Sequence, residues 1–368
     1  MEAFDSSQAQ VEAFDLLPDS QPNDRQLMEN LMEYHAEKRN SVIPYLLEKS
    51  PEFRELSDVR QQGWETPEGD KYFASLRRNA DKSDEKTSTY FHNLMKTIGY
   101  EIDRATNAFK IQQVDSTPPA ILDICMAPGA FLQIALKKNP GSHALAFSLP
   151  VSRGGYRSRL ASGSNTKRVY LDVTMLAADM GMDQIPEGHE DAENFLPRQF
   201  EEGQLFDLVI CDGQVLRQHL RGAYRESRQA KRLVTTQLAL GLQHVRPGGT
   251  MIVLLHRLEA WNTVNLIWLF RLFKPKKGHA KRSSFYMVAT DIQSQTPEAI
   301  EAIKRWKRIW RAATFDSDED YGKVILDEDS SIETLLEDFG PELVKLGKAI
   351  WKIQADALAQ APFMKKSK

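Results

Sequence analysis

The chain has 368 residues, which suggests either one large domain with additions or two domains. Its hydrophobic fraction of 41% is enough for a sizeable core, and its charged fraction of 27% is ordinary for a soluble protein. The formal net charge of -3 excludes an overall polycation, so any binding of nucleic acid must come from a local basic patch.

The two cysteines, Cys125 and Cys211, lie too far apart to form a CxxC pair. We therefore expect neither a disulfide framework nor a zinc or other metal site. The N-terminal residues MEAFDSSQAQ lack the apolar region of a signal peptide, and no run of about 18 apolar residues occurs. These features favour an intracellular protein of the cytoplasm or nucleus that does not bind membranes.

The first third of the chain is predicted to be helical after a polar start. Residues 1–24 are polar and are expected to form a flexible tail. Apolar residues then recur at helical spacing. The helices expected on this basis lie at residues 24–49, 71–78 and 86–109. Residues 25–89 are accordingly assigned to a helical N-terminal extension.

Short apolar runs alternate with helical patterns in the middle of the chain, residues 90–292. Strands are expected at residues 120–125, 143–147, 168–171, 206–211, 249–255 and 284–289, and helices at residues 131–138, 231–245 and 263–272. Continuous apolar strands alternating with helices indicate a mostly parallel sheet covered on both faces. This region is therefore predicted to be an α/β domain.

Helical patterns return in residues 293–368, which form a predicted C-terminal helical extension. Thr296 and Pro297 begin a helix that continues to Ala312. Its Trp306 and Trp310 are expected to dock on the α/β domain rather than to bind nucleic acid. The following acidic stretch, Asp316–Asp320 and Asp327–Asp329, is interpreted as a linker. Ser330 and Glu333 then suggest a capping box for a last helix that ends near Ala359.

The loop after the first strand, Met126–Ala130, is a candidate ligand site. Ligands of open parallel sheets bind beyond the carboxyl ends of the strands. Gly129 and Ala130 are small, which lets a ligand approach the backbone closely. The free N–H groups of the helix that starts near Phe131 favour electronegative atoms of that ligand. The alternative is an ordinary strand-turn-helix corner.

Four segments in order resemble the FtsJ/RrmJ-type RNA 2′-O-ribose methyltransferases, with a fifth upstream. They are Leu122–Phe131, Phe206–Gly213, Pro247–Val253 and Arg282–Thr290, preceded by Arg104–Ile111. The resemblance spans about residues 104–290, and the helical extensions lie outside it. It implies a Rossmann-like α/β methyltransferase fold in a divergent family member, with S-adenosylmethionine as cofactor.

The resemblance also implies cofactor contacts. They are Asp123, Pro128, Gly129, Ala130, Phe131, Ser148, Asp172 and Asp212. Asp172 would accept a hydrogen bond from the adenine amine, although an Asp after a strand is also a common helix N-cap. Asp123 would organise the loop or cap it. Ser148 stands where the family has a ribose-binding carboxylate, so its contact would be weaker.

The family's catalytic set of Lys, Asp, Lys and Glu is only partly present. The resemblance places Asp212 and Lys110 at the first two positions; the alternatives are an Asx-turn for Asp212 and a solvated surface lysine for Lys110. The central lysine, which would activate a ribose hydroxyl, falls on Leu254, and the glutamate falls on Ser284. His256, two residues after Leu254, is a possible replacement base or a structural histidine.

Two basic segments, residues 217–232 and 274–282, are candidates for contacts with RNA phosphates. In the first, arginines at a spacing near four are expected to form a stripe along one helix face. Its candidate substrate contacts are Arg217, Arg221 and Arg225, with Tyr224 placed to stack on a base. The alternative is a solvated charged surface.

Three functions remain open on this basis. The first is an S-adenosylmethionine-dependent methyltransferase that acts on RNA. The second is a catalytically impaired protein of the same fold that binds the cofactor or RNA, which Leu254 and Ser284 suggest. The third is a methyltransferase with a small-molecule acceptor that is already nucleophilic.

Overall fold

The computed structural model describes most of the chain. The described residues are 42–64, 67–69, 71–72, 85–112, 118–161, 163, 165–216, 219–270, 284–326 and 331–364. The predicted tail, Arg217 and the basic segment 274–282 lie outside these ranges, as do most of the two helices expected before residue 80. The boundaries predicted at 25–89, 90–292 and 293–368 stay predictions.

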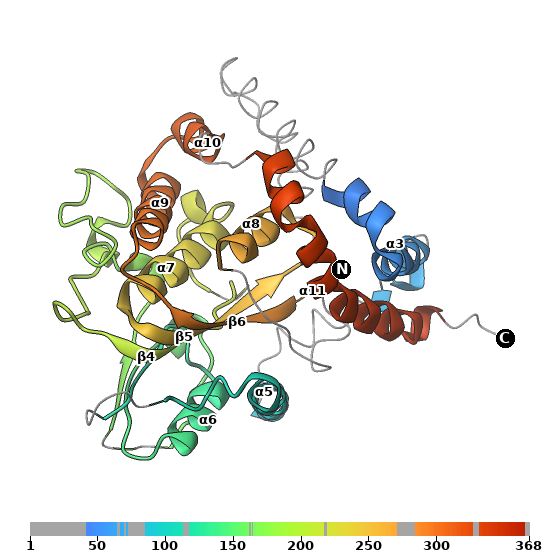
Figure 1. Cartoon of the computed structure of the whole chain (residues 1–368). Coiled ribbons are helices and arrows are strands. Elements are labelled where there is room, and N and C mark those ends of the chain that lie inside the picture. The colour runs from blue at the N-terminus through green and yellow to red at the C-terminus, as the bar shows by residue number, and fades with distance from the viewer. Residues whose placement is uncertain are drawn as a thin grey trace. The chain divides into compact units, whose positions relative to one another are not determined.

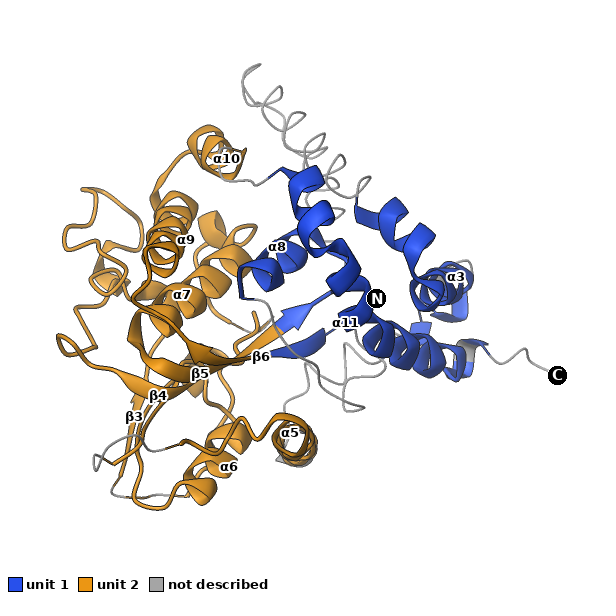
Figure 2. Ribbon diagram, viewed as in Figure 1, with its two compact units in different colours: residues 1–83, 255–287, 329–368 blue, residues 84–254, 288–328 orange. Residues whose placement is uncertain are grey.

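The chain divides into two compact units, each built from separate stretches of sequence (Figure 2). Unit 1 contains residues 1–83, 255–287 and 329–368, and unit 2 contains residues 84–254 and 288–328. Each unit is described by itself below.

A six-stranded sheet with the strand order β3-β2-β1-β4-β5-β6 organises the fold (Figure 1). The strands are β1 (Ala120–Asp123), β2 (His143–Ser148), β3 (Thr166–Tyr170), β4 (Phe206–Cys211), β5 (Val245–His256) and β6 (Ser284–Ile292). The pairs β1–β2, β2–β3, β1–β4 and β4–β5 are all parallel. All six strands coincide with predicted apolar runs, and the mostly parallel α/β sheet is confirmed.

The helices of unit 2 cover the part of the sheet that belongs to this unit. They are α5 (Glu85–Thr106), α6 (Ala130–Lys138), α7 (Gln229–His244), α9 (Pro297–Phe315) and α10 (Asp318–Leu326). Figure 1 shows α7 and α9 over one face and α5 and α6 over the other. The central strands are buried on both sides, which explains why β1 and β4 are continuously apolar rather than alternating.

Two buried tryptophans fix α9 within unit 2. Trp306 and Trp310 lie on the same helix face and are both buried. The indole Nε1 of Trp310 donates a hydrogen bond to the carbonyl oxygen of Thr174 at 3.1 Å. The prediction that these tryptophans dock on the domain is confirmed.

Unit 1 is mainly helical. It contains α3 (Pro51–Trp64), α8 (Trp261–Phe270) and α11 (Ile332–Ala359). The rings of Phe53 in α3 and Trp351 in α11 meet edge to face, with centroids 5.1 Å apart. The buried carboxylate of Glu259 accepts a hydrogen bond from Arg60 Nη1 at 2.7 Å. Among the described residues of both units, no helix is long and apolar enough to cross a membrane.

Two C-terminal details differ from the prediction. Residues 318–326 form helix α10 instead of a linker. Its acidic first turn, which includes Asp318, complements the positive end of the helix dipole, and Ser317 Oγ accepts a hydrogen bond from Asp320 N at 3.1 Å. The N-cap of α11 is Ser331 rather than Ser330, and its hydroxyl accepts from Thr334 N at 3.4 Å.

His244, at the end of α7, is expected to make the stability of unit 2 sensitive to mild acid. Its ring is buried, stacks on Phe200 at 4.1 Å, and has Nδ1 2.8 Å from the carbonyl oxygen of Gln204. A carbonyl only accepts, so the neutral ring carries its proton on Nδ1. Burial lowers the pKa of His244 below its usual value. The fold therefore favours the neutral ring.

A lowered folded-state pKa fixes the direction of this effect. The stabilisation from His244 is complete above the unfolded-state pKa of about 6.5 and is lost as the pH falls through the folded-state value. Urea unfolding at pH 7.5 and pH 5.5 should show a larger loss for the wild type than for His244→Gln. Equal losses in the two proteins would contradict this assignment.

Candidate functional site

Two carboxylates meet where the strand order reverses, at the carboxyl ends of β1 and β4. Asp123 ends β1 and pairs in register with Ile210, and Asp212 directly follows β4. Asp123 is buried and accepts a hydrogen bond from Cys125 N at 3.3 Å. Its burial and the negative charge of Asp212 raise the pKa of Asp123 well above the usual range. Ligands of open α/β sheets bind at this kind of position.

The loop after β1 turns into α6 at a glycine. Gly129 is the N-cap residue of α6 and has a φ of 103°, a left-handed conformation that favours glycine. Its N-cap position carries no side-chain hydrogen bond. Ala130 and Phe131 are buried, and the Phe131 ring packs edge to face on Phe109 with centroids 5.6 Å apart. Phe131 thus contributes to the core beneath the loop.

The segment after β2 lies directly on this loop. Arg159 N donates a hydrogen bond to the carbonyl oxygen of Pro128 at 2.9 Å. A Cβ atom added to Gly129 would lie only 3.3 Å from Cβ of Leu160. Residues 159 and 160 therefore occupy the space next to the small residues of the loop.

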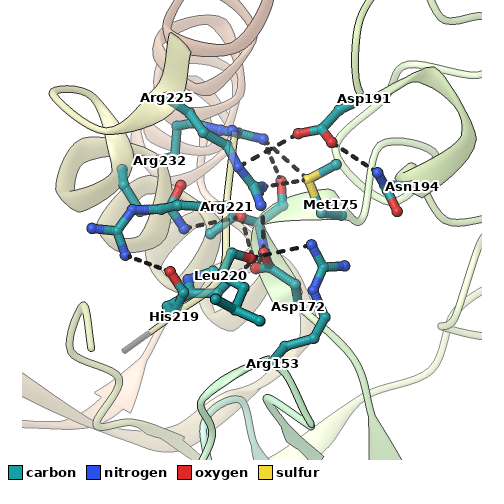
Figure 3. A network of polar contacts seen from close by, with 12 residues as sticks. Arg153, Asp172, Met175, Asp191, Asn194, His219, Leu220, Arg221, Arg225 and Arg232 are labelled. Carbon is teal, nitrogen blue, oxygen red and sulfur yellow. Dashed lines mark hydrogen bonds and ion pairs between the residues drawn. The ribbon is translucent and has the colours of Figure 1, made fainter. Parts of the chain in front are cut away.

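Asp172, just beyond β3, already has partners on both carboxylate oxygens (Figure 3). It is the N-cap of the short helix η2 (Val173–Met175), and its Oδ1 accepts from Thr174 N at 3.0 Å and from Thr174 Oγ1 at 2.8 Å. Its Oδ2 lies 3.1 Å from His219 Nε2 and 3.3 Å from Arg225 Nη1. Burial alone would raise the pKa of Asp172, but His219 and Arg225 outweigh it and lower the pKa.

The arginines after β4 do not form the predicted stripe on one helix, so that expectation is wrong. Residues 223–225 form the short helix η4, and α7 begins only at Gln229. Arg225, Arg228 and Arg232 are buried, because they turn inward to acidic side chains and backbone oxygens of unit 2.

The other candidate substrate contacts also have partners in unit 2. Arg221 makes two hydrogen bonds to Glu226, at 2.6 and 2.5 Å. Tyr224 OH donates to Asp191 Oδ2 at 2.8 Å, and Arg225 Nε lies 3.5 Å from the same oxygen. The predicted substrate contacts Arg221, Tyr224 and Arg225 are therefore paired with residues of the same unit.

Gln237 in α7 holds the backbone beside Asp212, a contact that the sequence analysis missed. Gly213 N donates to Gln237 Oε1 at 2.8 Å, and Gln237 Nε2 donates to the carbonyl oxygen of Gly213 at 3.2 Å. A Cβ atom on Gly213 would lie 2.4 Å from Sγ of Cys125, so only glycine fits. The sequence gives no signal for this role, because α7 buries several other polar residues besides Gln237.

Of the remaining candidates, Leu254 lies beside Asp212, because the preceding residues Val253 and Cys211 pair in register. Lys110 is exposed, and its Nζ donates to the carbonyl oxygen of Lys138, at the end of α6 opposite to Ala130, at 3.4 Å. This contact places the Lys110 amine at the carboxyl end of α6, about 13 Å along the helix from the loop at Gly129. Ser148 is buried at the end of β2, and Leu254 is buried in β5. His256 is exposed, and both it and Ser284 belong to unit 1.

A sequence model of the FtsJ-like methyltransferases matches residues 99–292, more than half of the 368 residues. The chain belongs to the FtsJ-like methyltransferase family. No curated protein matches this FtsJ-like chain by sequence.

Solved structures similar to this FtsJ-like chain include three methyltransferases. A putative ribosomal RNA methyltransferase from Plasmodium falciparum is 17% identical, over 54% of this chain and 96% of that one, with a TM-score of 0.33. Human methyltransferase-like protein 13, solved with S-adenosylhomocysteine, is 16% identical over 60% and 92%, with a TM-score of 0.30. An O-methyltransferase family protein from Burkholderia thailandensis is 11% identical over 67% and 75%, with a TM-score of 0.31.

Proposed function

We propose that the chain is an S-adenosylmethionine-dependent methyltransferase whose cofactor binds at the carboxyl ends of β1 to β4. The observation that carries this proposal is the placement of Asp212 next to Asp123 at the reversal of strand order. The loop at Gly129 and Ala130 opens α6 beside them, and its uncapped helix start favours electronegative atoms. Membership of the FtsJ-like family supports the same activity.

The residues at this edge suit a cationic cofactor. S-Adenosylmethionine would supply an electrophilic methyl group on a positively charged sulfur, and the carboxylate of Asp212 favours such a charge. The proposed cofactor contacts remain Asp123, Pro128, Gly129, Ala130, Phe131, Ser148, Asp172 and Asp212, as the resemblance implies. Of these, Asp212 is the one proposed to act on the acceptor, by orienting it or by taking its proton.

RNA is the proposed acceptor class, with the family as its main support. A ribose hydroxyl is a poor nucleophile, and a positioned base contributes about 10²–10⁴-fold to the rate of such a reaction. Leu254 cannot supply that base, and His256 or another group would have to replace it. Phosphate contacts would rest on Arg217 and residues 274–282, because Arg221 and Arg225 are paired within unit 2.

A first experiment is calorimetric titration of the protein with S-adenosylmethionine and S-adenosylhomocysteine. Binding with a dissociation constant below about 1 mM supports the proposal. Transfer of labelled methyl groups to total RNA, compared with a small-metabolite extract, then identifies the acceptor class. No binding at millimolar cofactor, in a protein shown to be folded, would overturn the proposal.

Asp212→Asn should reduce methyl transfer by about 10²-fold or more, because the amide cannot take a proton and carries no charge. Cofactor binding should weaken by a smaller factor than transfer, since the substitution keeps the shape of the side chain and removes only its charge. The matched control is Asp183→Asn, which alters an exposed carboxylate of unit 2. Unchanged transfer by Asp212→Asn would refute the role of Asp212.

A second candidate is a family member that has lost efficient transfer but keeps the fold and binds a ligand. Two observations favour it: the apolar Leu254, and the partners that already occupy Asp172. Cofactor binding with no transfer to either acceptor pool would select this candidate.

A further inference from the structure

Two segments of unit 2 lie over the proposed cofactor contacts. The first, called cover segment 1, comprises residues 151–160 after β2. The second, called cover segment 2, comprises residues 219–226 after β4. Both lie within the described residues, and each contacts a different part of the proposed site.

Cover segment 1 packs against the loop after β1. The hydrogen bond from Arg159 N to the carbonyl oxygen of Pro128, at 2.9 Å, fixes its backbone to that loop. Leu160 then stands over Gly129, within 3.3 Å of where a Cβ would be. Leu160 therefore blocks a ligand from contacting the backbone at Gly129.

Cover segment 2 contacts the carboxylate of Asp172. His219 Nε2 lies 3.1 Å and Arg225 Nη1 lies 3.3 Å from the same carboxylate oxygen, Oδ2. The other oxygen accepts two hydrogen bonds from Thr174. Both oxygens of the carboxylate thus already have partners within the chain, and these partners compete with the amine of a ligand.

The two segments are tied to each other. Leu220 N donates to the carbonyl oxygen of Arg153 at 3.1 Å, and Arg153 Nη2 donates to the carbonyl oxygen of Leu220 at 3.3 Å (Figure 3). This reciprocal pair makes the two segments a single cover. Nη2 of buried Arg225 has no hydrogen-bond partner among the described residues. A buried donor without a partner costs free energy, which lowers the stability of the closed state.

We propose that this cover is an autoinhibitory contact: it closes the cofactor site, and S-adenosylmethionine enters only when the cover opens. The proposal rests on the proposed function, since it concerns the same site. The measured affinity is then the affinity of the open site multiplied by the fraction of molecules that are open. Changes that release the cover raise the affinity without adding any contact to the cofactor.

The test variant is His219→Ala/Leu220→Pro. The first change frees part of Asp172, and the second removes the N–H that donates to Arg153 without disturbing the core, because the Leu220 side chain is 64% exposed. The matched control is His219→Gln/Leu220→Ala, which keeps a side-chain donor for Asp172 and the N–H of residue 220. Leu220→Pro alone serves as a milder variant in case the double variant folds poorly.

Calorimetric titration with S-adenosylhomocysteine should show at least about tenfold tighter binding by the test variant than by the wild type, and an affinity within about twofold of wild type for the control. Leu220→Pro alone should give a smaller gain in the same direction. Hydrogen exchange of the Arg159 amide, which is bonded in the closed cover, reports opening independently of the ligand.

The outcomes separate the two proposals. Measurable binding by the wild type that is at least about tenfold weaker than binding by the test variant supports both. Equal affinities of the test variant and the wild type overturn the cover and leave the proposed function standing. Absence of binding in every variant, although faster exchange at Arg159 shows the cover open, overturns both.

Discussion

Trp310→Ala is expected to destabilise unit 2 by about 3–5 kcal/mol, the usual cost of truncating a buried tryptophan. The Trp310 side chain is 0% exposed, and its ring meets Phe315 edge to face at 5.8 Å. Its Nε1 donates to the Thr174 carbonyl oxygen, which also accepts a hydrogen bond from Arg232. Alanine removes the donor and leaves a cavity between α9 and η2.

Urea unfolding monitored by circular dichroism measures this effect. Arg311→Ala, at the next and exposed position of α9, is the control and should change the stability by no more than about 0.5 kcal/mol. Trp310→Phe should fall between the two, because it keeps a ring but loses the hydrogen bond. A loss below about 1 kcal/mol in Trp310→Ala would show that α9 is not held by this residue.

The fold of the α/β part could be predicted because its signals are local. Runs such as Phe206–Cys211 are buried on both faces of a parallel sheet, so they are continuously apolar. Such a run can be recognised as a strand without knowing which strands lie next to it. The turn into a helix near Phe131 was likewise predicted, whereas the positive φ of Gly129 was not. The acidic stretch at Asp318 was misread as a linker, because charge alone does not distinguish a solvated loop from the first turn of a helix.

The site could be predicted only in part, because its partners come from distant positions in the chain. The resemblance placed Asp172 in the site, and its position after a strand suggested the N-cap that the structure shows, but its partners His219 and Arg225 lie in the irregular segment after β4. The sequence analysis predicted a helix in that segment, with its arginines along one face. In the structure the long helix begins only at Gln229. The segment before it is irregular, and Arg225 turns inward to acidic side chains such as Asp191. Gln237 was missed for the same reason, since nothing local links it to Gly213.

Asp172→Ala is expected to cost about 3–5 kcal/mol of stability at pH 7, because it leaves a charge buried without its partner. The Arg225 side chain is 0% exposed and faces Asp172 at 3.3 Å. Alanine therefore leaves the guanidinium buried, with Asp191 at 3.5 Å as its acidic partner and the Met175 sulfur at 2.8 Å. The His219 ring loses the same partner. Asp183→Ala is the control: Asp183 is 79% exposed and its ion pair with Arg198 is 3.8 Å long, so a change of at most about 0.5 kcal/mol is expected.

A double-mutant cycle tests whether the stranded charge is the cause. Arg225→Met in the Asp172→Ala background removes that charge and keeps an unbranched side chain, so it should restore about 1–3 kcal/mol, whereas Arg225→Met alone should destabilise. The pH of the measurement matters: the pKa of Asp172 is lowered in the fold, so its contribution is complete above the unfolded value of about 3.9 and is lost as the pH falls further. At pH 7 the full effect is therefore present. Additive losses in the double variant would mean that Asp172 stabilises unit 2 through its hydrogen bonds to Thr174 and not through Arg225.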